Sequence, residues 1–168
     1  MNIKKIVAII GGGPAALMLA ASLDNTKYKV TIYEKNKALG RKFLVAGKGG
    51  FNLTHSESME TFIDRYTPND FLKNALSNFT NQDLIQWLET IGIPTFVGSS
   101  KRIYPIKGIK PIEVLKKIML VLEKNQVEII YNKEWIAWNE KEDLIFKDGQ
   151  LVEADYKVFA LGLSLIHI

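Results

Sequence analysis

A glycine-rich turn near the N-terminus has the residue types and the spacing of a site for the phosphates of a dinucleotide. Gly11, Gly13 and Ala16 occupy the three small-residue positions of the pattern G-x-G-x-x-G/A. The first glycine permits a tight turn, the second leaves the backbone open to a pyrophosphate, and the third small residue lets a helix pack closely. The N–H groups that begin the helix attract phosphate. Pro14, which itself has no N–H, and Ala15 lie at this helix start and are also candidate cofactor-binding residues. The alternative is a glycine turn without a ligand; a Walker-type loop is excluded, because no G-K-[S/T] follows at its spacing.

An acidic residue completes this pattern at the end of the next predicted strand. Glu34 comes 18 residues after Ala16. At this spacing from the glycine motif, a carboxylate can accept both hydroxyls of an adenosine ribose. The same negative charge would repel a 2′-phosphate, which argues against NADP. Lys35 comes next in the chain and is also a candidate cofactor-binding residue. A methyltransferase would use a similar glycine loop and acidic residue, so the pattern alone leaves both classes open.

Residues 34–52 combine glycines with positive charge and are expected to form a long loop. Its five cations are Lys35, Lys37, Arg41, Lys42 and Lys48. Long ordered loops often carry function, and such a cluster can bind phosphodiesters. RNA-binding segments usually offer aromatic side chains for stacking, whereas only Phe43 and Phe51 lie near these cations. The residues therefore argue against nucleic acid as a partner, and a solvated charged surface is the other alternative.

The elements that must position these residues begin with a βαβ unit. Residues 4–10 form a continuous apolar run typical of a strand buried on both faces. Residues 15–23 predict a helix and residues 28–33 a second strand, which together imply a parallel sheet. Helices are further predicted at residues 58–66, 68–79, 80–91 and 111–124, and strands at 95–97, 102–104, 127–131, 135–139, 144–147, 151–153 and 156–161. Pro68 is expected at the first helical position of its helix. Thr80 or Asn81 is expected to cap the next helix, with Asp83 in its first turn.

The second glycine-rich segment resembles that of a known family. Residues 40–55, GRKFLVAGKGGFNLTH, are similar to the stretch Gly-Arg-Lys-x-x-x-Ser-Gly-x-Gly-(Arg/Lys)-x-Asn-x-Thr of the BaiN-like bacterial FAD flavoproteins, also called YhiN-like or aminoacetone-oxidase-like. Residues 52–57 and 96–105 resemble one branch of that family. The resemblance implies an α/β fold: a Rossmann-like FAD-binding domain with a parallel sheet, interrupted by the start of an inserted segment. It also implies FAD-dependent oxidoreductase activity, with NAD(P)H as a candidate electron donor.

Family positions add cofactor-binding candidates that spacing alone does not supply. By resemblance, Arg41 and Lys42 would neutralise the pyrophosphate, and Gly47, Gly49 and Asn52 would approach the flavin. Ala160 and Gly162 resemble a returning segment that passes near the cofactor. The sequence departs from the family at Ala46, where serine is commoner, and at residues 50–51, where many members have Arg-Cys. A mechanism that needs those side chains is in doubt here, and the catalytic residues are left unassigned.

Composition bounds the other possibilities. The 168 residues suit about one domain. The absence of cysteine and the presence of only two histidines argue against disulfide scaffolds and metal centres. No apolar run reaches the roughly 18 residues of a membrane span, and residues 6–10 are better interpreted as a core strand than as part of a signal peptide. We therefore expect a cytoplasmic protein with a small-molecule substrate, no membrane contact and no metal; the oligomeric state is left open.

Several single residues have two interpretations. His55 is either a proton donor or, as we favour, a capping or hydrogen-bonding residue. Trp135 is interpreted as packing, with an adenine contact as the alternative. Arg102 and Tyr104 either pack within a strand or face the substrate.

The length and the last residues suggest part of a larger enzyme. We expect residues 1–94 to be the first part of the FAD-binding core with a helical excursion, 95–155 to hold a helix and hairpin elements, and 156–162 to be a returning strand. Residues 163–168 depart from the family pattern and are predicted to be a non-native tail on a truncated N-terminal piece. Two other functions stay open: a non-catalytic ADP- or FAD-binding module or inactive fragment, and a flavin-dependent RNA-modifying enzyme.

Overall fold

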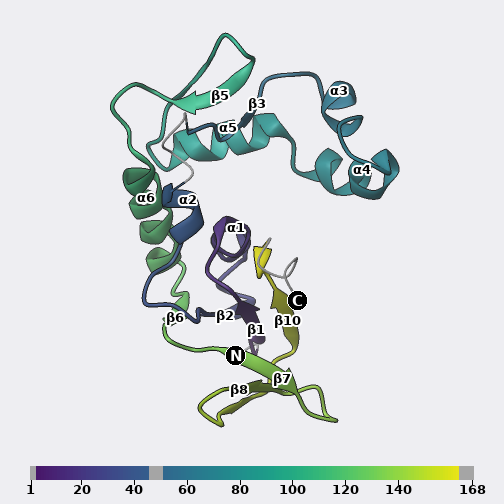
Figure 1. Ribbon diagram of the computed structural model, residues 1–168, viewed down its shortest axis with the longest axis vertical. Helices are drawn as coiled ribbons and strands as arrows, with labels where there is room; N and C mark the ends of the chain where they lie inside the picture. The colour runs from purple at the N-terminus through teal and green to yellow at the C-terminus, as the bar shows by residue number, and fades with distance from the viewer. Residues whose placement is uncertain (1–2, 46–50, 163–168) are drawn as a thin grey trace. The chain divides into compact units, whose positions relative to one another are not determined.

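The computed structural model describes residues 3–45 and 51–162, which form two compact units (Figure 1). The first unit comprises the described residues of Met1–Leu44 and Ile118–Ile168, and the second those of Val45–Lys117. The expected division at residues 94, 155 and 162 stays a prediction, and the expected tail at 163–168 lies outside the described residues.

A four-stranded sheet forms the centre of the first unit, in the order β10-β1-β2-β6. Its strands are β1 (Lys5–Ile10), β2 (Tyr28–Tyr33), β6 (Glu128–Ile130) and β10 (Tyr156–Phe159). All three pairings are parallel. The last four residues of β1 and of β2 are buried, as expected of parallel strands covered on both faces. The predicted α/β fold with a parallel Rossmann-like sheet is confirmed.

Asp155 joins the start of β10 to the start of β1. One carboxylate oxygen accepts a hydrogen bond from Lys5 Nζ at 2.8 Å, and the other accepts from the Ile6 N–H at 2.7 Å. The bond from Lys5 is the main cause that lowers the pKa of Asp155 below its ordinary value. These contacts fix the register in which Val7 lies opposite Tyr156.

Helix α1 (Pro14–Ser22) packs closely because its inner face is made of small residues. Ala16 and Ala20 are fully buried, and Leu17 is almost so. The end of the helix is held by Asn125, whose Nδ2 donates to the Ala21 carbonyl at 3.0 Å. Asn125 follows α6 (Pro111–Lys124), a helix predicted with the same bounds.

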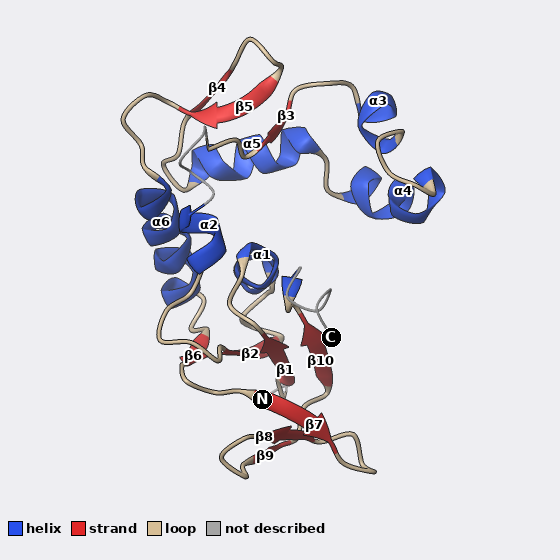
Figure 2. Cartoon of the chain, in the orientation of Figure 1, coloured by secondary structure: helices blue, strands red, loops and turns tan. Residues whose placement is uncertain are grey.

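A small antiparallel sheet, β7-β8-β9, completes the first unit (Figure 2). Its strands are β7 (Trp135–Trp138), β8 (Leu144–Phe146) and β9 (Leu151–Val152). Phe146 is fully buried and its ring lies 4.8 Å from that of Tyr33. This contact belongs to a core cluster that Phe146 and Leu144 share with Ala8 and Ile10 of β1. The predicted hairpin therefore packs on the end of β1, directly before the glycine turn.

The described residues of the second unit include the start of α6, three shorter helices and a three-stranded antiparallel sheet in the order β3-β5-β4. The helices are α3 (Met59–Ile63), α4 (Asn69–Asn78) and α5 (Asn81–Thr90), and the strands are β3 (Thr54–His55), β4 (Thr95–Val97) and β5 (Arg102–Pro105). Helix α5 begins with a capping box: the Thr80 hydroxyl accepts from the Asp83 N–H, and the Asp83 carboxylate accepts from the Thr80 N–H. Of the two expected caps, Thr80 and Asn81, the structure has Thr80 as the N-cap and Asn81 as the first helical residue.

The structure corrects three details of the sequence interpretation. The stretch expected to be loop contains a short helix, α2 (Arg41–Val45), which follows Gly40 at a φ of 63°. Strand β3 was not predicted, because its hydrogen bonds come from β5, far along the chain. Pro68 is the N-cap of α4 and not its first helical residue.

Candidate functional site

A cavity of about 440 Å³ lies at the carboxyl ends of β1, β2 and β10 in the first unit. The chain passes from β1 to β2 on one side of the sheet and returns as β10 on the other, so the strand order reverses at β1. Ligands of open α/β sheets bind at such a reversal. The volume is in the usual range for sites that bind small molecules.

The glycine turn forms one wall, and its three glycines are needed for different reasons. Gly11 has a φ of 101°, and a Cβ there would lie 2.6 Å from the Ala160 carbonyl oxygen. A Cβ on Gly12 would collide with the Leu39 side chain and lie 3.0 Å from Glu34 Oε2. A Cβ on Gly13 would meet nothing within 4 Å. Gly11 and Gly12 are therefore required by the fold, whereas Gly13 leaves open space beside the cavity.

Glu34 is buried against this turn, with 8% of its surface exposed. Its Oε2 accepts a hydrogen bond from the Gly12 N–H at 2.7 Å. Its Oε1 accepts two from Asn36, at 2.8 Å from the backbone N–H and at 2.5 Å from Nδ2. The carboxylate is thus held in one orientation by the loop that follows it.

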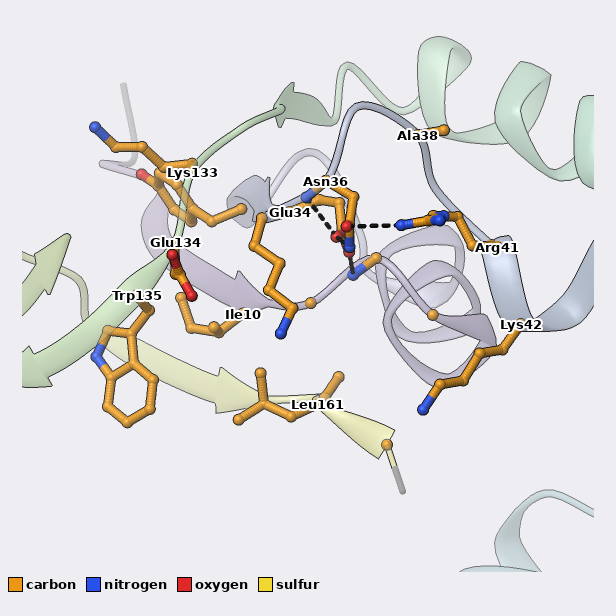
Figure 3. A pocket seen from close by; sticks show the side chains of 18 of the residues that line it. Ile10, Glu34, Asn36, Ala38, Arg41, Lys42, Lys133, Glu134, Trp135 and Leu161 are labelled. Carbon is orange, nitrogen blue, oxygen red and sulfur yellow. Dashed lines mark hydrogen bonds between the residues drawn. The ribbon is translucent and has the colours of Figure 1, made fainter. Parts of the chain in front are cut away.

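Asn36 also connects Glu34 to the basic segment. Arg41 Nη1 donates to Asn36 Oδ1 at 2.8 Å, so the guanidinium is directed toward Asn36, while Lys42 extends away from both (Figure 3). Only one orientation of the amide places its NH₂ on a carboxylate and its oxygen on a guanidinium. The chain of contacts therefore runs from Arg41 through Asn36 and Glu34 to Gly12.

Lys133 and its neighbours form the opposite wall. Lys133 is 7% exposed, yet its Nζ contacts the Asp148 carboxylate and donates to Gln150 Oε1 at 2.5 Å. The ammonium also lies 5.2 Å from the centre of the Phe146 ring, a favourable cation–π distance. The Lys133 N–H donates to the Glu34 carbonyl at 2.9 Å. Lys133 therefore holds this wall against both the hairpin and the Glu34 loop.

Trp135 both packs and lines the cavity. Its ring stacks on that of Trp138 at 5.4 Å and lies 4.7 Å from that of Phe159. The packing interpretation is confirmed, and the ring is also part of the cavity wall (Figure 3). Its buried Nε1 has no hydrogen-bond partner among the described residues.

Most of the predicted cofactor-binding residues line the cavity. They are Gly11, Gly13, Pro14, Glu34, Lys35, Arg41, Lys42, Ala160 and Gly162. Ala16 is buried in α1, which fits its predicted packing role, and Ala15 is not part of the wall. Asn52 belongs to the second unit and does not line this cavity. Gly47 and Gly49 lie outside the described residues. The assignment of all these residues to a cofactor stays a prediction.

Two residues of the cavity wall, Asn36 and Lys133, were not predicted from the sequence. Asn36 stands two residues after the acidic residue of the motif, a position from which a side chain can reach back to that carboxylate. Lys133 gave no signal, because it comes to the cavity from β6, almost a hundred residues further along the chain.

The other singled-out residues lie in the second unit. Ser58, and not His55, caps α3. His55 Nδ1 is buried, lies 3.4 Å from Glu57 Oε1 and makes no hydrogen bond within the described residues. The rings of Tyr104 and Phe96 lie 5.8 Å apart, which supports the strand-packing interpretation of Tyr104. These contacts do not test the two alternatives, that His55 donates a proton and that Arg102 faces a substrate.

Comparison with known proteins identifies a family and relatives that match most of this chain. The model of the HI0933-like protein Rossmann domain matches residues 5–166. The ribosomal RNA dihydrouridine synthase of Haemophilus influenzae is 35% identical over 139 residues, 77% of this chain and 34% of that protein. The 3-dehydro-bile acid delta(4,6)-reductase of Clostridium scindens is 28% identical over 160 residues, 93% of this chain and 38% of that protein. The chain thus spans about a third of the length of these relatives.

A solved structure agrees with the fold. That of THI4 from Thermovibrio ammonificans has a TM-score of 0.61 at 16% identity, over 95% of this chain and 58% of that one. Within the described residues, no helix is long and apolar enough to cross a membrane. The expectation that nucleic acid is not a partner is not supported, because one relative carries the name of an RNA-modifying enzyme.

Proposed function

The chain belongs to the HI0933-like Rossmann domain family, and on this premise we propose that it binds FAD as the N-terminal part of a flavin-dependent oxidoreductase. One observation carries the proposal: the open backbone at Gly13 and the buried carboxylate of Glu34 belong to the same cavity wall. A phosphate needs the first, and an adenosine ribose needs the second. The resemblance of residues 40–55 to flavoproteins favours FAD over other dinucleotides.

The residues that line the cavity fit the nucleotide half of this cofactor. The pyrophosphate would approach Gly13 at the start of α1, where free N–H groups and the helix dipole favour negative charge. Lys35 and Lys42 line the same cavity and carry no ion pair among the described residues. Their charges would offset that of the two phosphates. Arg41, directed toward Asn36, would lie on the ribose side instead.

The wall formed by Lys133, Glu134 and Trp135 would hold the adenine. The Trp135 ring offers an apolar surface, and its buried Nε1 has no partner that the described residues supply. When bound, the isoalloxazine supplies the redox chemistry, and the protein binds and orients it. We assign no catalytic acid or base to this chain, and NAD(P)H is the electron donor that we propose.

The test is an absorbance spectrum of the purified chain, followed by titration with FAD and with ADP. We expect flavin absorbance that bleaches on addition of NADH or NADPH. Glu34→Lys should lose the flavin, because it replaces the ribose acceptor by a cation, whereas Glu153→Lys, an exposed position outside the cavity, should keep it. A colourless protein that binds ADP but not FAD would support the non-catalytic module, and a protein that binds neither would refute the proposal.

A second observation favours RNA as the substrate of the parent protein. A more open pocket next to the cavity is lined by Lys35, Asn36, Lys37, Ala38, Arg41 and Asn132, with three cations and no carboxylate among them. Such a surface suits a phosphodiester backbone, and a relative is named as a ribosomal RNA dihydrouridine synthase. The relative named as a bile acid reductase supports a small-molecule substrate instead.

A substitution at Lys37 can test RNA binding separately from FAD binding, because Lys37 lines the basic pocket and not the cavity. Lys37→Gln should weaken binding of an RNA hairpin and lower the slope of log K against log salt by about one. Lys73→Gln, exposed on the second unit, is the matched control. FAD content should stay the same in both variants. If both variants and the wild type bind the RNA hairpin with equal affinity, this pocket is not an RNA-binding surface. We propose a cytoplasmic location whether the substrate is RNA or a small molecule.

A further inference from the structure

The Glu34 carboxylate already accepts several hydrogen bonds from the protein, so it has fewer acceptor positions free for a ribose than the sequence motif suggests. An ionised carboxylate has about four acceptor positions, two on each oxygen. Asn36 fills both positions of Oε1, through its backbone N–H and its Nδ2, and the Gly12 N–H fills one position of Oε2. Among the described residues, one position on Oε2 is left. We infer that Glu34 binds one ribose hydroxyl of an adenine nucleotide and not two, and that the Asn36 side chain sets this limit.

This inference rests on the proposed binding of an adenine nucleotide and specifies how its ribose is recognised. A carboxylate without these contacts could accept both hydroxyls, which is the usual expectation for this motif. Here the second hydroxyl would have to displace the Asn36 amide. That displacement would leave a buried carboxylate oxygen with one donor fewer and would also break the contact from Arg41. The ribose hydroxyls should therefore contribute unequally to affinity.

Asn36 keeps its position for reasons that do not depend on a ligand. Arg41 Nη1 holds its Oδ1 at 2.8 Å, and its backbone carbonyl accepts from the Asn132 N–H at 3.2 Å. Asn36 is thus held once at its side chain and once at its backbone, while its Nδ2 reaches Glu34 (Figure 3). Among the described residues that donate to the Glu34 carboxylate, Asn36 is the one that does so through its side chain, since the other two donors are backbone N–H groups.

The test compares three probes, ADP, 2′-deoxy-ADP and 3′-deoxy-ADP, by calorimetric titration of the flavin-free chain. We expect one deoxy analogue to bind about tenfold or more weakly than ADP, the usual loss for a hydrogen bond to a charged group, and the other to bind within about twofold of ADP. In Asn36→Ala the Oε1 position is released, so both analogues should then bind about tenfold or more weakly than ADP. Lys37→Ala, on the same loop but without a bond to Glu34, is the matched control and should retain the asymmetry.

The outcomes separate this inference from the proposed function. If ADP does not bind to the wild-type chain, the proposed nucleotide site is wrong. If ADP binds but the two deoxy analogues lose affinity equally, Glu34 accepts both hydroxyls and the inference is overturned. It is also overturned if Asn36→Ala binds ADP but retains the wild-type asymmetry, because the limit would then come from another residue.

Discussion

The substitution Gly13→Ala should separate the requirements of binding from those of folding. Gly13 is the N-cap of α1, with φ −82° and ψ 178°, a backbone conformation open to any residue. A Cβ at this position meets nothing within 4 Å. Alanine reduces the entropy of the unfolded chain by about 0.4–1 kcal/mol but is a poorer N-cap than glycine by a similar amount. The free energy of unfolding should therefore change by no more than about 0.5 kcal/mol.

Binding should respond very differently. If a pyrophosphate approaches the Gly13 backbone, the added methyl group takes the space of a phosphate oxygen. We expect the affinity for ADP to fall at least about tenfold, or about 1.4 kcal/mol. Gly11→Ala is the comparison, because its positive φ costs about 1–2 kcal/mol and its Cβ would also collide with the Ala160 carbonyl. That variant should lose at least about 2 kcal/mol of stability, or about 4–8 °C in Tm.

Chemical denaturation and ADP titration of the two variants give the result. A Gly13→Ala protein that is as stable as the wild type and binds ADP equally well would show that no phosphate approaches this turn. A Gly13→Ala protein destabilised as much as Gly11→Ala would refute the geometry of the turn itself.

Three further predictions concern stability. Phe146→Ala should lower the free energy of unfolding by about 3–5 kcal/mol, because the ring is fully buried; a loss below 1 kcal/mol in urea denaturation would contradict its place in the core. Thr80→Ala should cost about 0.5–2 kcal/mol by removing the capping box of α5, whereas Thr80→Ser should keep most of that energy. The hydrogen bond from Arg65 lowers the pKa of Glu57 below its ordinary value of 4.5, so the folded state favours the carboxylate. This contribution is complete above pH 4.5 and is lost as the pH falls through the lowered pKa. Arg65→Gln should therefore make stability less sensitive to acid as the pH falls from neutral through that pKa.

The sheet and its glycine turn could be predicted because their signals are local. An unbroken apolar run must be buried on both faces, and a turn that begins a helix needs small residues at fixed positions, so β1, α1 and β2 follow from about thirty consecutive residues. Thr80 and Asp83 predicted the start of α5 for the same reason, since a capping box lies within four residues.

The parts that could not be predicted depend on distant contacts. Strand β3 forms because β5 supplies its hydrogen-bond partners. It has only two residues, too few to show a strand pattern in the sequence. Lys133 reaches the cavity through the position of β6, which the sequence predicts as a strand but not as the neighbour of β2. The limit that Asn36 places on Glu34 depends on hydrogen-bond directions, which spacing alone does not give.

The contact between Lys5 and Asp155 can form only late in protein synthesis, because Asp155 is made long after Lys5. The two residues are 150 positions apart, and at about 5–20 residues per second a ribosome needs about 8–30 s to make the intervening chain. During that time β1 can pair with β2, but its other edge has no partner, so a strand of KIVAII presents unpaired backbone groups to the surroundings. An exposed apolar edge is a template for aggregation. In the nascent chain, this edge of β1 therefore has no partner strand until β10 has been made.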